Sequence, residues 1–285
     1  MVYCLRNKYS LKNFPPPNFS DSFSFNKKIE FSHDRKSKIL AVGSSMALIN
    51  LESSSVKKHL KSASYTNLSS WGLSIKDMFR LIKIYQLKYD FTTLVMSSNM
   101  CDFSANEKIF SSSDIIKYLE SRYKNWYNFY NIDLKYLFAN FSIANESIRD
   151  NRHYESFRMD TDGGVLLDGN NFEKRKQRWN NDDIGIVKKY QYDYLDSINQ
   201  FCKKKHIKFY FFQSPMRKGL INSQNKGAIN THVKKCKKIL SNSVYFVNSL
   251  DTIWSDNLFV DGTHFNKKGA YQYTNYCFQQ LEPNE

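Results

Sequence analysis

Residues 38–47 read KILAVGSSMA, a short apolar run that ends in one glycine and two serines. An apolar run of this length, closed by glycine, is typical of a buried strand in a parallel sheet. The residues that follow, Ser44 to Leu60, have helical potential. This order predicts a strand whose carboxyl end turns directly into a helix.

The same alternation of strand and helix continues along the chain. The further predicted strands are short and apolar or aromatic: Ser64–Leu68, Phe91–Met96, His206–Phe212 and Val244–Val247. The further predicted helices are Ser74–Leu87, Ile184–Cys202, Lys226–Leu240 and Asn266–Leu281. The fold class we predict is therefore α/β: a three-layer sandwich with a central, mostly parallel five-stranded sheet and helices on both faces. Such sheets place active sites at the carboxyl ends of their strands.

Two parts of the chain depart from this alternation. Residues 1–36 are polar, with prolines at 15–17, and are expected to form an irregular N-terminal arm. Residues 37–285 then form a single domain, which is interrupted at about 103–181 by an aromatic-rich, largely helical insertion. An insertion at the carboxyl end of a strand is expected to lie over the site as a lid. Its aromatic side chains either form a satellite hydrophobic core or stack on sugar rings, and both can hold.

The chain is strongly basic, because 42 Lys and Arg against 27 Asp and Glu give a net charge of +15. Lysines cluster at 203–205 and within 234–238. Solvated helix ends are the simplest interpretation of such clusters; the alternatives are an anionic glycan, peripheral association with an anionic membrane surface, or a nucleic acid. Since no nucleic-acid-binding motif accompanies the charge, no nucleic-acid partner is expected.

Cysteine usage and hydropathy predict a cytoplasmic protein, with the inner membrane surface as an alternative location. The five cysteines are scattered and form no C-x-x-C pair, so neither a zinc site nor a disulfide framework is expected. No run of 18 apolar residues is present, and the N-terminus lacks the apolar region of a secretory signal.

Two distant segments carry the residue types of nucleophilic catalysis. Ser45 follows the first strand directly, where its hydroxyl points toward the carboxyl edge of the sheet and the N-terminus of a helix supplies N–H groups. The segment FVDGTHF places Asp261 three residues before His264. Histidine is the usual base for a serine nucleophile, and a neighbouring carboxylate can fix its tautomer. Taken alone, each segment is explained more simply by helix capping and an incidental histidine.

Four segments follow one another at predicted strand ends: G-S-S at 43–45, Gly72, Asn99 and D-x-x-H at 261–264. Their order resembles the SGNH/GDSL hydrolase superfamily, whose four blocks contribute Ser, Gly, Asn and His. The resemblance covers about residues 38–102 and 242–281 and leaves the aromatic insertion outside.

The resemblance implies a flavodoxin-like fold and a catalytic role for residues of all four blocks. It implies Ser45 as the nucleophile, His264 as the base and Asp261 as the partner of the histidine. It also implies an oxyanion hole formed by the Ser45 N–H, the Gly72 N–H and the Asn99 side-chain amide.

Two blocks depart from the usual pattern of the family. The first reads G-S-S instead of G-D-S, which resembles the branch with cell-envelope proteins that transfer D-alanyl or acetyl groups onto polymers. The third reads Ser97-Ser98-Asn99-Met100 instead of G-x-N-D, so Asn99 lacks the flanking glycine and aspartate. Asn106 lies too far beyond the strand to be the first substitute.

These observations leave three functional hypotheses. The first is O-acetylation of a surface polysaccharide, with an anionic polysaccharide as the candidate substrate, through a Ser45 acyl-enzyme. The second is an esterase that uses water as the acceptor and deacetylates a glycan or small ester, since the same atoms serve both reactions. The third is a basic glycan-binding protein without turnover. The first two need no metal and no bound cofactor; acetyl-CoA is a candidate acyl donor, and no oligomeric state is indicated.

Overall fold

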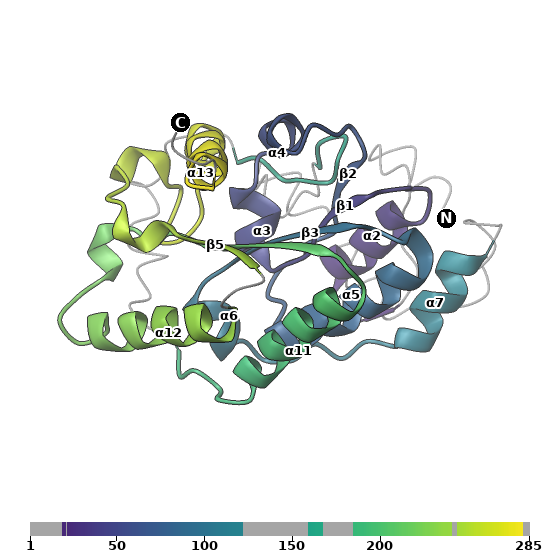
Figure 1. Ribbon diagram of the computed structural model, residues 1–285, viewed down its shortest axis with the longest axis horizontal. Coiled ribbons are helices and arrows are strands. Elements are labelled where there is room, and N and C mark those ends of the chain that lie inside the picture. Colours follow the sequence, from purple (N-terminus) through teal and green to yellow (C-terminus); the bar gives the residue numbers. More distant parts are fainter. Residues whose placement is uncertain (1–18, 21, 122–158, 168–184, 241–243, 282–285) are drawn as a thin grey trace, which may run out of the picture. The chain divides into compact units, whose positions relative to one another are not determined.

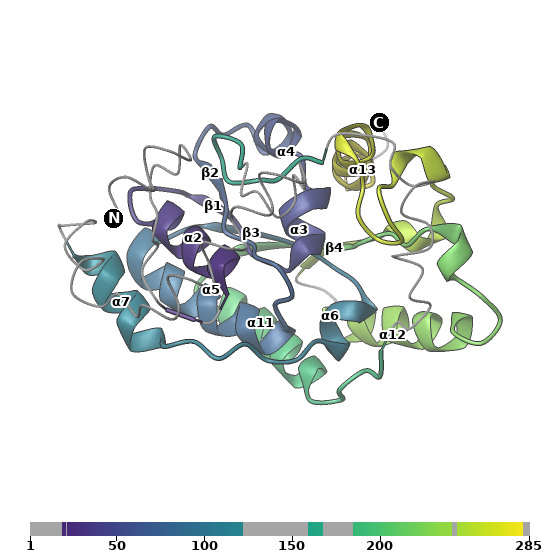
Figure 2. The same ribbon diagram turned by 180° about the vertical axis from the view of Figure 1, so that it is seen from behind.

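The computed structural model describes residues 19–20, 22–121, 159–167, 185–240 and 244–281 (Figures 1 and 2). The chain forms two compact units. The larger unit takes in Lys36–Glu107 and Met159–Glu285, and the smaller one takes in Met1–Arg35 and Lys108–Arg158. Among the helices of the described ranges, none combines the length and the apolar character needed to cross a membrane.

Within the described residues, the larger unit is built on five strands in the order β2-β1-β3-β4-β5, and every neighbouring pair is parallel. The strands are β1 (Ile39–Ala41), β2 (Tyr65–Asn67), β3 (Thr93–Ser98), β4 (Lys208–Gln213) and β5 (Val244–Asn248). Every residue of β1 and β3 is buried, as expected for inner strands covered on both faces. The predicted α/β sandwich is confirmed.

Helices cover both faces of this sheet (Figures 1 and 2). One face carries α3 (Ser45–Asn50), α4 (Ser53–His59) and α13 (Lys267–Gln279). The other carries α5 (Ile75–Tyr89), α6 (Met100–Ser104), α11 (Gln191–Lys204) and α12 (Lys226–Ile239). Short 3-10 turns form at Lys218–Leu220, Ser249–Asp251 and Asp256–Leu258. Because α3 and α6 begin where β1 and β3 end, their first residues share one edge of the sheet.

Two helix predictions need correction. The helix expected over Ser44–Leu60 is two helices, because Leu51 is extended and the Glu52 carboxylate accepts hydrogen bonds from Ser54 N (3.2 Å) and Ser55 N (2.7 Å), which starts α4. The helix expected from Ile184 begins only at Gln191. The described residues before it form a connecting segment whose Lys188 N–H donates to Phe103 O at 2.9 Å.

A dense aromatic core lies between the sheet and α13. It joins strand residues such as Val95 and Phe212 to Tyr273 and Phe278 of α13. The Phe259 and Phe265 rings, 4.4 Å apart between centroids, belong to the same core. This packing fixes both ends of the loop that contains Asp261 and His264.

The smaller unit corrects the prediction for the N-terminal arm. Phe23–Ser32 is a helix, α2, rather than irregular chain, because Ser22 caps its first turn by accepting a hydrogen bond from Phe25 N. A second helix, α7 (Ser112–Glu120), lies at the start of the predicted insertion. The His33 ring contacts Ser121 O at 2.8 Å, which links the segments carrying these two helices.

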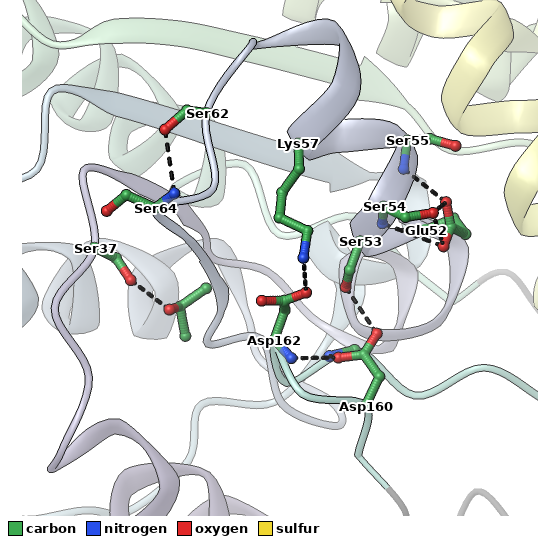
Figure 3. A network of polar contacts seen from close by, with 12 residues as sticks. Ser37, Glu52, Ser53, Ser54, Ser55, Lys57, Ser62, Ser64, Asp160 and Asp162 are labelled. Carbon is green, nitrogen blue, oxygen red and sulfur yellow. Dashed lines mark hydrogen bonds and ion pairs between the residues drawn. The ribbon is translucent and has the colours of Figure 1, made fainter.

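The prediction of a lid over about 103–181, like the proposed domain boundaries, stays a prediction, since residues 122–158 and 168–184 lie outside the described residues. The stretch 159–167 is described, and Figure 3 shows how it is held. Asp160 accepts a hydrogen bond from Ser53 Oγ (2.8 Å), and Lys57 pairs with Asp162 (2.6 Å). Asn67 N also donates to Asp162 O at 2.7 Å, so this stretch is fixed to α4 and the end of β2.

Candidate active site

Ser45 is held at a tight turn between β1 and α3. A Cβ atom on Gly43 would lie 2.6 Å from Ala47 Cβ, so the close approach requires glycine. Ser44 caps α3, because its Oγ accepts a hydrogen bond from Met46 N at 3.1 Å. Ser45 is then the first residue of the helix, where backbone N–H groups have no partner within the helix. Capping therefore belongs to Ser44, and the Ser45 side chain makes a different contact.

The structure brings Ser45, His264 and Asp261 into one hydrogen-bonded series. Ser45 Oγ lies 2.8 Å from His264 Nε2, although 219 residues separate them. His264 Nδ1 lies 2.7 Å from Asp261 Oδ2. When Nδ1 carries the ring proton and donates a hydrogen bond to the carboxylate, Nε2 is the acceptor for the Ser45 hydroxyl. This is the geometry that general-base activation of a serine requires.

The Asp261 carboxylate is held by its own loop. Its Oδ1 accepts hydrogen bonds from Thr263 N (2.9 Å) and His264 N (2.8 Å), which leaves Oδ2 for the imidazole. Burial acts to raise the pKa of Asp261, but the His264 charge and these hydrogen bonds outweigh it, and the pKa is lowered. The group is therefore a carboxylate at neutral pH, as a partner for imidazolium must be.

Asn50 is a residue of this site that the sequence prediction missed. It is fully buried at the end of α3. Its Oδ1 accepts a hydrogen bond from Phe265 N (2.9 Å), and its Nδ2 donates to Thr263 O (3.0 Å). These two hydrogen bonds hold the backbone on both sides of His264. No local sequence pattern marks such a role, since the partners lie more than 200 residues away.

Asn99 lies beside the Ser45 turn, at the carboxyl end of β3. Its Oδ1 caps α6 by accepting a hydrogen bond from Cys101 N (3.0 Å), and its Nδ2 lies 3.2 Å from the sulfur of Met46. The amide donor is thus adjacent to the residue that follows Ser45. Asn106, by contrast, is exposed and contacts Lys188 Nζ at 2.7 Å.

Gly72 belongs to a loop that reaches the same edge of the sheet. Its φ of +61° lies in the left-handed region, where glycine is favoured. Within this loop, Ser70 N donates to Gly43 O at 3.0 Å, and the Trp71 ring meets the His264 ring edge-on with centroids 5.9 Å apart. Trp71 therefore borders the imidazole, and Gly72 follows it on the exposed rim.

Asp102 is the second residue that the sequence prediction missed. It is buried in the first turn of α6, and its Oδ2 accepts a hydrogen bond from Ser98 Oγ at 2.7 Å. Burial raises the pKa of Asp102 to about 7, against the opposing effects of Ser44, Ser98, the Asn99 N–H and His264. The sequence signal that could have identified Asp102 is its place as an acidic residue just beyond the end of an apolar strand.

Fold and geometry together define the class: a parallel α/β protein with serine, histidine and aspartate in hydrogen-bonded series. No protein-family model matches the chain, and no curated protein sequence matches it. The chain is similar in structure to a protein described as an acylhydrolase from Bacteroides fragilis, with 12% identity, a TM-score of 0.41 and coverage of 88% of this chain and 90% of that one. It is also similar to a protein described as a platelet activating factor from Streptococcus pneumonia, with 11% identity, a TM-score of 0.44 and coverage of 99% and 98%.

Proposed function

We propose that the protein is an enzyme of serine-dependent acyl transfer. The observation that carries this proposal is the series Ser45 Oγ, His264 Nε2 and Asp261 Oδ2, with contacts of 2.8 Å and 2.7 Å. Ser45 begins α3 after β1, and Asp261 and His264 lie in the loop before α13, so segments far apart in sequence converge at one edge of the sheet. The alignment of a base on a serine hydroxyl supports catalysis over binding alone.

The reaction follows from these contacts. His264 Nε2 takes the hydroxyl proton as Ser45 Oγ attacks the carbonyl carbon of the acyl donor. The imidazolium then gives this proton to the leaving group, and the acyl group remains on Ser45 as an ester. In the second half, His264 takes a proton from the acceptor hydroxyl, the acceptor oxygen attacks the ester carbonyl, and the proton returns to Ser45 Oγ. Asp261 stabilises the imidazolium in both halves.

The negative charge on the carbonyl oxygen needs donors on the side opposite His264. The proposed donors are the Ser45 N–H, the Asn99 amide and the Gly72 N–H. The contact of Asn99 Nδ2 with Met46, the residue after Ser45, supports the Asn99 amide as a donor. The hydrogen bond from Ser70 N to Gly43 O brings the loop that contains Gly72 toward the Ser45 N–H. One such donor is worth about 10²–10³ in rate.

As acceptor we propose a hydroxyl group of an anionic polysaccharide. A groove of about 830 Å³ runs between α12 and β5, and Lys226, Lys234 and Lys237 line it. Its apolar residues Ile221, Ile229 and Leu250 also belong to a small cluster that contains Met100. Met100 follows Asn99, so this cluster connects the groove to the end of β3, although no proposed catalytic residue lines the groove itself. The positive charge of these lysines favours the binding of an anionic polysaccharide, and it is not needed when water is the acceptor.

The donor is proposed to be an acetyl group, with acetyl-CoA as the candidate carrier. The protein is proposed to act in the cytoplasm or, through its basic charge, at the inner membrane surface. Hydrolysis to free acetate is the second candidate function, since water and a sugar hydroxyl compete for the same acyl-enzyme.

An active-site-directed fluorophosphonate separates the enzyme from a binding protein. The proposal expects stoichiometric labelling of Ser45 in the folded protein and none in Ser45→Ala. Ser54→Ala is the matched control, because Ser54 is an exposed serine that contacts the Glu52 cap of α4. Failure to label the wild type at Ser45 contradicts both enzymatic readings.

Product analysis separates the transferase from the esterase. The protein is incubated with acetyl-CoA, and in a second arm with an activated acetyl ester, together with an anionic polysaccharide. The transferase predicts a mass gain of one acetyl group per modified sugar that Ser45→Ala abolishes. Release of acetate without any mass gain on the polysaccharide contradicts the transferase and supports the esterase.

A further inference from the structure

Asp102 is a buried carboxyl group that the proposed reaction does not use. Its side chain lies in α6, three residues after Asn99, and the residue is only 4% exposed. A carboxyl group removed from water is costly unless neighbouring donors compensate for it. Its neighbours therefore indicate what this group does in the fold.

The donors around Asp102 come from two different strand ends. Ser98 Oγ, at the end of β3, donates to it at 2.7 Å. The hydroxyl of Ser44, at the end of β1, and the backbone N–H of Asn99 also interact with the same carboxyl group. A single buried side chain thus joins the turn that precedes α3 to the turn that precedes α6.

Each of these partners is bonded to a proposed oxyanion donor or to its immediate neighbour. Ser44 precedes Ser45 and caps α3 through Met46 N. Asn99 carries its amide against the sulfur of Met46. A shift of the Asp102 carboxyl therefore moves the Ser45 N–H and the Asn99 amide relative to each other.

We propose that Asp102 is a positioning residue that sets the separation of the Ser45 and Asn99 donors, and that protonation of Asp102 loosens this link. The proposal rests on the proposed function for its kinetic consequence. The ionised carboxylate accepts a hydrogen bond from Ser98 Oγ and is also favoured by the Ser44 hydroxyl and the Asn99 N–H. The protonated group carries a hydrogen on one oxygen, which weakens at least one of these bonds.

The surroundings of Asp102 leave it able to titrate near neutral pH. Burial is the main cause of its raised pKa of about 7, and the His264 charge opposes it. On α6, burial and the Asp102 charge raise the pKa of Cys101 to about 12, so this thiol stays neutral. From the loop before α13, the charge of Asp261 also reaches Cys101. Ser44, from the turn between β1 and α3, and Ser98, at the end of β3, face the carboxyl and do not titrate in this range.

The test combines an activity-independent readout with kinetics. Amide ¹⁵N shifts of Ser45 and Asn99 are followed from pH 5 to pH 9 in the wild type, Asp102→Asn and Glu30→Gln. Glu30 is the matched control, because it is a buried acid in the smaller unit. Hydrolysis of p-nitrophenyl acetate gives kcat and KM for the same proteins. His264 is present in all three, so a difference between wild type and Asp102→Asn isolates Asp102.

The proposal expects both resonances to titrate together near pH 7 in the wild type and in Glu30→Gln, and this titration to vanish in Asp102→Asn. It expects kcat of Asp102→Asn to fall about 10-fold with little change in KM, because mispositioned donors act on the transition state. Identical titrations and equal kcat in wild type and Asp102→Asn overturn the inference. A wild type that shows the shared titration but does not react with the ester supports the link and contradicts the proposed function.

Discussion

The side-chain oxygen of Asn50 accepts a hydrogen bond from the backbone N–H of Phe265 at 2.9 Å, across 215 residues of sequence. Its amide nitrogen donates to Thr263 O at 3.0 Å. Asn50 ends α3, the helix that begins with Ser45. One six-residue helix therefore carries the proposed nucleophile at its first residue and holds the loop of the proposed base at its last.

Asn50→Ala is expected to impair catalysis through His264 without touching substrate. The change leaves Thr263 O and Phe265 N without their partner, so His264 loses its fixed position. We expect kcat to fall roughly 100-fold and the free energy of unfolding to fall by about 1–3 kcal/mol. The measurements are ester hydrolysis and urea unfolding. Asn275→Ala is the control, since Asn275 bonds to Ser55 and His59 instead; an equal loss of kcat in both variants refutes the specific role of Asn50.

Asp261→Asn is expected to reverse the tautomer of His264. The new amide donates to Nδ1, which moves the ring proton to Nε2 and removes the acceptor for the Ser45 hydroxyl. We expect kcat to fall by about 10³–10⁴ while the fold is kept, because Oδ1 can still accept from Thr263 N and His264 N. Long-range ¹⁵N spectra of the imidazole report the tautomer. An unchanged tautomer together with full activity excludes this role for Asp261.

Asp102 is expected to make stability depend on pH with a defined sign. Its pKa is raised from 3.8 to about 7 in the fold, so the folded state holds a proton that the unfolded state releases. Its stabilising contribution is complete below pH 3.8 and is lost as the pH rises to about 7. Relative to Asp102→Asn, the wild type should lose up to ~4 kcal/mol of unfolding free energy between pH 4 and pH 8. A pH-independent difference between the two proteins contradicts the raised pKa.

Gly43→Ala is expected to disrupt the turn that presents Ser45. The added methyl group meets Ala47 Cβ at 2.6 Å and Ser97 O at 3.3 Å, so β1 or α3 must move. We expect a loss of about 1–3 kcal/mol in unfolding free energy and slower labelling by a fluorophosphonate. Gly227→Ala is the control, because a Cβ there meets nothing within 4 Å. If both variants label at the wild-type rate, the close approach at Gly43 does not matter for the site.

Charge reversal in the groove tests the proposed anionic acceptor. Lys234→Glu with Lys237→Glu places negative charge along α12, away from Ser45. We expect KM for an anionic polysaccharide to rise about 10-fold or more, while kcat/KM for p-nitrophenyl acetate stays unchanged. The same change in KM with a neutral polysaccharide would argue against recognition by charge.

Much of the site was predictable because parallel strands deliver their ends to one edge. The sequence alone shows which residues follow an apolar segment or precede a helix. Three residues of the candidate site have such positions: Ser45, Asn99 and His264. Asn50 and Asp102 were not predicted, because their meaning depends on partners from other segments. The same limit explains α2, where one capping serine gives helical order to a polar stretch that otherwise suggests an irregular arm.

The register of α11 shows a second limit. Tyr190, Tyr194, Ile198 and Phe201 recur at helical spacing in the sequence, whereas the residues buried in the structure include Tyr192, Leu195, Ile198 and Cys202. Phe79 of α5 contacts the rings of Tyr194 and Phe201 at the edge of this interface. Both sets of residues have helical spacing, so which set is buried depends on how the neighbouring helix packs against α11.

The most direct test of the central claim is to trap the acyl-enzyme. The protein is mixed with p-nitrophenyl acetate, quenched in acid within milliseconds to seconds, and analysed by intact mass and peptide mapping. The account predicts a transient gain of one acetyl group on the peptide that contains Ser45, slowed in His264→Ala and absent in Ser45→Ala. Turnover of the ester with no acetyl group on Ser45 at any time, or equal acetylation in Ser45→Ala, contradicts it.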